Sequence, residues 1–112
     1  MVIGASSSWA LYGLCGGHVY NQNGEPQDSA YVQGTNCSGV FLSTYSNYTG
    51  LYGLNDTSPP PSGTYYYCAD KSGVGHAQTS IYHTQGTADT WDAYLSGSSR
   101  PCDPCLDRGG GP

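Results

Sequence analysis

The sequence predicts an all-β protein that folds as a two-sheet sandwich of seven short strands. No stretch longer than 10 residues lacks both Gly and Pro, so a helix of typical length, about 11 residues, has no room to form. Between the turn-forming clusters, β-branched and aromatic residues recur at every second position, which is the period of a strand. The 112 residues suffice for one such domain.

Four strands are expected in the first half of the chain, at residues 17–22, 29–35, 40–45 and 51–54. In the first of these, Val19 faces inward, whereas His18 and Tyr20 face outward. The turn that follows contains Asn23-Gly24, a pair that adopts positive φ at little cost. By the same alternation, the inward positions of the next strands are Ala30, Val32, Tyr52 and Leu54.

Three more strands are expected at residues 64–70, 76–84 and 87–95. They follow residues 55–63, where three consecutive prolines favour a stiff extended crossover because proline has no N–H for a sheet ladder. Tyr65 and Tyr67 share the inward parity of the first of the three strands.

Outside the sandwich, which spans residues 15–95, the two ends differ in character. Residues 1–14 are expected to form an extended N-terminal arm or an extra edge strand, with Trp9 and Leu11 on one side. Residues 96–112 are rich in Gly, Pro and Cys and are expected to form an irregular tail. The first five residues are too few for the apolar region of a signal peptide, so either a leader has been removed or the sequence starts at an artificial boundary.

The composition excludes several classes of protein. Only 15 residues are Leu, Ile, Val or Phe, and only 11 are charged, with a net charge of −5. These values argue against a helical bundle, a coiled coil, a membrane span and a basic nucleic-acid binder. They leave a thin core that must use tyrosine rings and that would gain stability from crosslinks.

The five cysteines are typical of an oxidising compartment, so a secreted or cell-surface protein is expected. Cys15 could pair with Cys37, or Cys37 with Cys68, while Cys102 and Cys105 could close a small loop or bond to other subunits. Because five is odd, at least one thiol is free or intermolecular. A single CxxC in a Gly/Pro-rich tail argues against structural zinc and against redox catalysis, so no metal or cofactor is expected.

Three N-x-[ST] sequons make Asn36, Asn47 and Asn55 candidate glycosylation sites. Covalent glycans are expected at these residues if the source glycosylates its secreted proteins. The same three residues would serve equally well as plain turn formers.

Three blocks of the sequence resemble the carboxypeptidase regulatory-like domains. The family pattern G-x-V-x-D-x-x-G-x-P, followed by A-x-V, matches residues 17–26 (GHVYNQNGEP) and 30–32. The patterns G-x-Y-x-L and G-x-Y-x-V-x-A match residues 50–54 and 63–69, with Tyr67 in place of Val. The resemblance implies a transthyretin-like sandwich, usually a non-catalytic module beside enzymes, in adhesins or in surface proteins. The additional cysteines depart from the family pattern.

No catalytic residue is expected. The sequence lacks a G-x-S-x-G elbow, and its histidines at 18, 76 and 83 fall on strands, at solvent-facing or edge positions. The transthyretin-like hydrolases of purine breakdown close with Y-R-G-S, which the last residues, RGGGP, do not match. His76 with His83, or His18 with Asp70, could bind a metal, but no spacing requires it. The stretch Asp89-Thr90-Trp91-Asp92 is too sparse for calcium.

The expected function is that of a non-catalytic extracellular structural protein that assembles with copies of itself into a fibre, filament or surface layer. Of the three positively charged residues, only Lys71 lies within the sandwich, so few lysines protect the sheet edges against pairing with other chains. The N-terminal arm could then complete a neighbour's sheet by strand addition. The alternative is an adhesion module that binds carbohydrate or protein through a tyrosine-rich sheet face. The candidate residues for assembly or binding are Trp9, Leu11, Tyr20, Tyr31, Tyr66 and Tyr82, although the tyrosine rings could also simply pack as cross-strand pairs.

Overall fold

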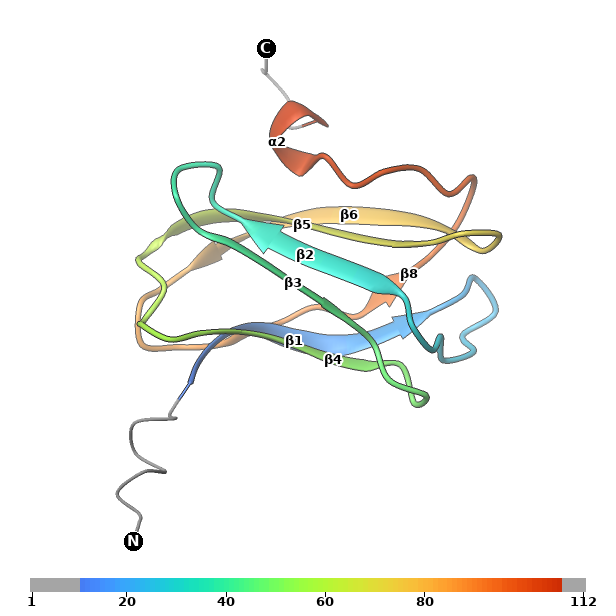
Figure 1. Cartoon of the computed structure of the whole chain (residues 1–112), viewed down its shortest axis with the longest axis horizontal. Coiled ribbons are helices and arrows are strands. Elements are labelled where there is room, and N and C mark those ends of the chain that lie inside the picture. Colours follow the sequence, from blue (N-terminus) through green and yellow to red (C-terminus); the bar gives the residue numbers. More distant parts are fainter. Residues whose placement is uncertain (1–10, 108–112) are drawn as a thin grey trace, which may run out of the picture.

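Two sheets face each other across the core in the computed structural model, which describes residues 11–107 (Figure 1). The elements are β1 Tyr12–Tyr20, β2 Tyr31–Thr35, β3 Phe41–Tyr45, β4 Leu51–Asp56, β5 Gly63–Lys71, β6 Gly75–His83, β7 Asp89–Thr90, β8 Ala93–Tyr94 and α2 Pro104–Asp107. One sheet has the order β4-β1-β7, with β8 also paired to β1, and the other has the order β3-β2-β5-β6. The predicted all-β, two-sheet sandwich is confirmed.

Strand β1 begins at Tyr12 rather than at residue 17, so the last residues of the expected N-terminal arm lie in a sheet. The absence of a side chain at Gly17 of this strand allows a neighbouring segment to come close. A Cβ atom on Gly17 would collide with the carbonyl oxygen of Trp91. Trp9 and the remainder of the expected arm lie outside the described residues.

The strand expected at residues 87–95 is divided into β7 and β8, which both run parallel to β1. Between them the main-chain ladder is interrupted. The N–H of His18 donates to the carboxylate of Asp92, at 2.9 Å, instead of to a main-chain carbonyl. This substitution by a side chain brings Asp92 beside β1.

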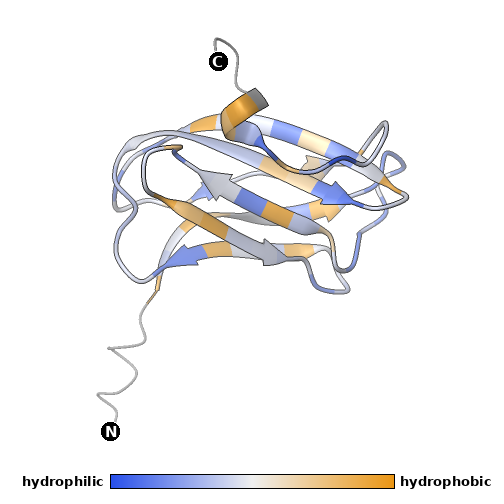
Figure 2. Cartoon of the chain, turned by 45° about the horizontal axis from the view of Figure 1, so that its top comes forward, coloured by the Kyte–Doolittle hydropathy of each residue, from blue (hydrophilic) through white to orange (hydrophobic). Residues whose placement is uncertain are grey.

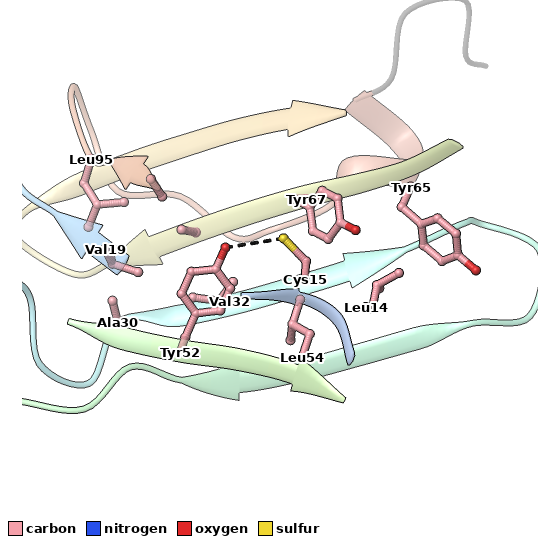
Figure 3. Packing of buried hydrophobic residues seen from close by; sticks show 12 residues of the cluster. Leu14, Cys15, Val19, Ala30, Val32, Tyr52, Leu54, Tyr65, Tyr67 and Leu95 are labelled. Atoms are coloured by element: carbon pink, nitrogen blue, oxygen red, sulfur yellow. Dashed lines mark hydrogen bonds between the residues drawn. The ribbon is translucent and has the colours of Figure 1, made fainter. Parts of the chain in front are cut away.

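The core consists of the predicted inward positions and a few additional residues (Figure 3). Val19, Ala30, Val32, Tyr52, Leu54, Tyr65 and Tyr67 are all buried, as the alternation predicts. The additional members of the cluster are Leu14, Cys15, Ala69, Ala93 and Leu95. Hydrophobic and hydrophilic residues alternate along the strands, so that each sheet presents one apolar face to the other (Figure 2).

The chain after β8 runs back across the outer side of the β3-β2-β5-β6 sheet and ends in the single turn of α2 (Figure 1). Two disulfides hold it there, Cys68–Cys102 to β5 and Cys37–Cys105 to the loop after β2. Ser96 also forms a bridge with His76 of β6. Among the described residues, no helix is long and apolar enough to cross a membrane.

Candidate active-site groove

A groove of about 510 Å³ lies over β1, β4 and β7. Its floor is the strand backbone itself, because β1 and β4 carry glycines here: Gly13, Gly16, Gly17 and Gly53. Its rim is polar and is formed by His18, Asn55, Asp89, Thr90 and Asp92. The volume falls in the range of small-molecule sites, about 300–1,000 Å³, so the groove can hold a small flat molecule against the sheet.

His18 and Asp92 form a histidine–carboxylate pair at the rim. The Nδ1 atom of His18 lies 3.9 Å from Oδ1 of Asp92, and the two side chains are 40% and 46% exposed. The same Oδ1 accepts the main-chain N–H of His18, which fixes the carboxylate relative to the ring. Both side chains are accessible to a ligand in the groove.

The segment that carries Asp92 is held firmly against the sheet. The N–H of Trp91 donates to the carbonyl of Gly16 at 3.0 Å. The hydroxyl of Tyr52, which reaches out from the core, donates to the carbonyl of Trp91 at 2.6 Å. The residue before Asp92 is therefore tied to both β1 and β4.

A second histidine–carboxylate pair supports the opposite part of the rim. His83 is fully buried, and its Nδ1 atom lies 2.8 Å from Oδ2 of Asp89. The ring packs edge-on against Tyr65, with 5.4 Å between centroids. Its Nε2 atom is buried and has no hydrogen-bond partner among the described residues. Asp89 also lines the groove, but its carboxylate is held by the buried imidazole, and its side chain is only 18% exposed.

Cys15 lies beneath the groove and is the free cysteine of the described chain. Its sulfur is 3.7 Å from the Tyr52 hydroxyl (Figure 3). Burial raises the pKa of the Cys15 thiol to about 11, the Tyr52 contact offsets only part of that rise, and the nearby charge of Asp89 adds to it. The thiol is thus protonated at neutral pH, which is the unreactive form.

None of the three disulfide pairings considered within the chain is present. Cys37 bonds to Cys105 and Cys68 bonds to Cys102, so each tail cysteine joins the sandwich rather than its neighbour in the CxxC. Cys15, for which a bond to Cys37 was one alternative, is free and belongs to the core cluster between the sheets.

The metal pairings considered from the sequence are not formed either. His18 lies beside Asp92, His83 beside Asp89, and Asp70 beside His76, with 3.0 Å between Nδ1 of His76 and Oδ1 of Asp70. Burial alone would raise the pKa of Asp70, but hydrogen bonds from Ser99, from the Arg100 main chain and from His76 outweigh it, so the pKa is lowered.

The tyrosines expected on open faces have mixed environments. Tyr20 packs on Tyr94 and Tyr31 on Tyr45, with ring centroids 5.0 and 5.5 Å apart, as in the cross-strand alternative. Tyr66 is half-buried, whereas Tyr82 and Leu11 are exposed.

The sequon residues lie in turns and at a strand end. The Oδ1 atoms of Asn36 and Asn47 accept main-chain N–H groups of their own turns, and Asn55 lines the groove. Glycosylation at these residues stays a prediction.

No family model and no curated protein sequence matches the chain. Among solved structures, it is similar to a 5-hydroxyisourate hydrolase from Klebsiella pneumoniae, with a TM-score of 0.54 and 18% sequence identity. The alignment covers 77% of this chain and 92% of that one. The fold is transthyretin-like.

This similarity corrects two expectations from the sequence. A chain with this transthyretin-like fold was expected to be a non-catalytic subunit that assembles into fibres, with adhesion as the alternative, and not an enzyme. The similar structure is that of a hydrolase, so the expectation of a non-catalytic role is wrong. The absence of Y-R-G-S was an insufficient reason to exclude catalysis, because a transthyretin-like fold can build a reactive site from other residues.

Sequence reasoning missed the groove because its parts are remote from one another. His18 and Asp92 are separated by 74 residues, and the alternation pattern predicts on which face a residue lies but not its neighbour. One signal was available. Gly16, just before the first expected strand, and Gly53, within the fourth, have the parity opposite to that of the inward residues Val19, Tyr52 and Leu54, so they indicate a part of the outer sheet surface without side chains.

Proposed function

We propose that this transthyretin-like chain is a hydrolytic enzyme, and that His18 with Asp92 is its catalytic pair. The observation that supports this best is the accessible imidazole beside a fixed carboxylate, at the rim of a groove with a bare backbone floor. The hydrolase named among the similar structures is consistent with this reaction class. Of the three histidine–carboxylate pairs, it is the one whose members are both well exposed.

The proposed reaction is the attack of water on a carbonyl carbon. With Nδ1 of His18 toward Asp92, Nε2 accepts a proton from water as the oxygen bonds to the carbonyl carbon. The Asp92 carboxylate stabilises the imidazolium that results. The bond from that carbon to a nitrogen leaving group then breaks, and His18 returns the proton to the nitrogen. The net change is the addition of one water molecule.

The groove favours a small, flat substrate with several N–H donors. A ring can lie on the floor because Gly16 and Gly53 project no side chain. The carboxylate of Asp92 and the amide oxygen of Asn55 can accept hydrogen bonds at the rim. Cyclic amides and ureides, including 5-hydroxyisourate, have this chemistry.

The test is a hydrolysis assay with 5-hydroxyisourate and a panel of cyclic amides and ureides, in which mass spectrometry detects products heavier by one water. We expect turnover by the wild type and a loss in kcat of about 10²- to 10⁴-fold in His18→Gln, because the general base is removed. Asp92→Asn should retain binding and lose kcat about tenfold or more, since the imidazolium then lacks its carboxylate.

Asp28→Asn is the matched control, because Asp28 is an exposed carboxylate in the turn between β1 and β2. It should have the kcat of the wild type. A wild type that hydrolyses no member of the panel, or a His18→Gln variant as active as the wild type, would contradict the proposal.

We also propose a relation to the carboxypeptidase regulatory-like domains and secretion from the cell. The first is supported by the three sequence blocks, which lie on β1, β2, β4 and β5 in the order of the family pattern. The second is supported by the two disulfides. Intact-mass measurement of the natural protein, with and without a glycosidase, tests secretion together with glycan occupancy at the three sequons.

A further inference from the structure

We propose that reduction of the Cys68–Cys102 disulfide creates a transition-metal site, with Cys68, His76 and Cys102 as ligands. The site lies on the outer side of the β3-β2-β5-β6 sheet, beneath the chain that follows β8, and it is separate from the groove. The donor atoms of the three residues all lie within 4.8 Å of one another. Two thiolates and an imidazole are the donor set that zinc and cobalt prefer.

The geometry already approaches that of a tetrahedral site. Bond lengths of about 2.3 Å to sulfur and about 2.0 Å to nitrogen place neighbouring sulfur and nitrogen ligands about 3.6 Å apart. In the structure, Sγ of Cys68 lies 3.5 Å from Nε2 of His76. Cys68 is fixed on β5 and His76 on β6, so a metal ion meets two ligands in place.

The third ligand lies where the backbone can adjust. Once the disulfide is reduced, the two sulfurs must separate to about 3.8 Å to share a metal ion. Cys102 lies outside the strands, in the segment between Ser96 and α2, so it can move by that amount without breaking a sheet ladder.

A carboxylate orients the imidazole for metal binding. Nδ1 of His76 lies 3.0 Å from Oδ1 of Asp70, and Asp70 also accepts the Ser99 hydroxyl at 2.7 Å and the Arg100 N–H at 2.8 Å. Asp70 is therefore a positioning residue rather than a ligand, as in many histidine sites of metalloproteins. It keeps the proton on Nδ1 and leaves Nε2 for the metal.

Gln78 is the group that the metal displaces. Its Oε1 atom lies 2.7 Å from Nε2 of His76 and accepts a hydrogen bond from the Arg100 guanidinium at 2.9 Å. Gln78 is exposed and can turn away toward solvent. Water then occupies the fourth position of the metal.

The site forms in two steps, reduction of the disulfide and binding of the metal. A phosphine reductant supplies two electrons, the S–S bond breaks, and each sulfur takes one proton, while the phosphine becomes its oxide with oxygen from water. Binding of a divalent ion then releases both thiol protons and the proton that Nε2 of His76 donates to Gln78, so the completed site has two thiolates, a neutral imidazole and no net charge.

The test uses the full chain, reduced with a phosphine, and Co²⁺ as the probe. We expect one Co²⁺ per chain, with the visible absorption of a tetrahedral ion and a thiolate-to-cobalt charge-transfer band. The oxidised chain should show neither. Cys68→Ser should remove most of the charge-transfer band, whereas the matched control Cys37→Ser should keep it, because Cys37 is reduced under the same conditions but lies outside the site.

Asp70→Asn tests whether the folded site, rather than any pair of thiols, binds the metal. We expect its Co²⁺ affinity to fall by about 10- to 100-fold, the usual effect of losing such an orienting partner. If the reduced chain loses its near-ultraviolet circular dichroism, Co²⁺ should restore the signal, because binding free energy then contributes to folding. Equal affinities for Cys68→Ser and Cys37→Ser, an unchanged affinity for Asp70→Asn, or no restored signal would each overturn the proposal.

Discussion

Buried hydroxyl and thiol groups are the distinctive residue-scale feature of this core. A chain with few aliphatic residues fills the space between its sheets with Tyr52, Tyr65, Tyr67 and Cys15, so ionisable groups occupy places where other proteins have Leu or Ile. Burial raises the pKa of each of the three tyrosines as well as that of the thiol. The unfolding free energy must therefore decrease as the pH rises into the alkaline range.

Cys15 makes this dependence measurable. Its pKa is 9.0 when exposed and about 11 in the folded protein, mainly because of burial. A pKa that is raised on folding contributes stability that is complete below pH 9 and is lost as the pH rises toward 11. By pH 10 we expect the wild type to lose about 1.4 kcal/mol of unfolding free energy that Cys15→Ala does not lose.

Urea unfolding at pH 7, 9 and 10 measures this difference, and the comparison concerns the change with pH rather than the absolute values. Cys15→Ala should be less stable at pH 7 because it leaves a cavity. A smaller loss of stability between pH 9 and pH 10 should persist in this variant, since Tyr52 and Tyr67 still titrate only when the chain unfolds. If the unfolding free energies of the two proteins changed in parallel with pH, the loss of stability by pH 10 could not be due to Cys15.

At the scale of strands and turns, the sequence predicted most of the fold. The alternation correctly placed the inward residues of β2, β4 and β5, because a strand that is buried on one face needs a period of two. It placed the start of β1 at residue 17 instead of Tyr12, because Gly13 and Gly16 interrupt the alternation. It also failed at β7 and β8, where the Asp92 side chain replaces a main-chain acceptor. Both failures lie in the groove, where local preferences give way to the demands of a site.

The packing of the Tyr67 ring against β2, the neighbour of β5 in the same sheet, depends on one glycine. A Cβ atom on Gly34 would lie 2.6 Å from Cε1 and 2.8 Å from Cδ1 of Tyr67, and 3.1 Å from Cδ1 of Leu54. The Tyr67 ring is fully buried and cannot swing out. Gly34→Ala should therefore lower the unfolding free energy by about 1–3 kcal/mol through overpacking, as chemical denaturation would measure.

Gly53→Ala is the matched control for this variant. Gly53 also lies within a strand, but its Cβ atom would have only the Asn55 amide nitrogen in reach, at an ordinary 3.4 Å. Its stability should stay within about 0.5 kcal/mol of the wild type. Equal stabilities for the two variants would show that the Tyr67 ring can relax, contrary to this account.

At the scale of the whole molecule, two nested disulfides replace the aliphatic core that the sequence lacks. Cys37–Cys105 spans 68 residues and Cys68–Cys102 spans 34 residues inside it, and both attach the chain after β8 to the sandwich. Once the inner disulfide is formed, the outer one closes a path of similar length, along residues 37–68 and 102–105. Loop entropy then assigns similar contributions to the two bonds, about 4 kcal/mol each.

Paired substitutions should show this near-equality. Cys37→Ala with Cys105→Ala, and Cys68→Ala with Cys102→Ala, leave no unpaired thiol behind and should each lower the unfolding free energy by about 4 kcal/mol. For a domain of this size that corresponds to a fall in Tm of roughly 15 °C or more, which calorimetry resolves easily. Removal of all four cysteines should leave the chain largely unfolded at 37 °C, because about 8 kcal/mol matches the whole stability of many small domains. If the variant without these four cysteines had the same Tm as the wild type, the stability of the molecule would instead come from its tyrosine core.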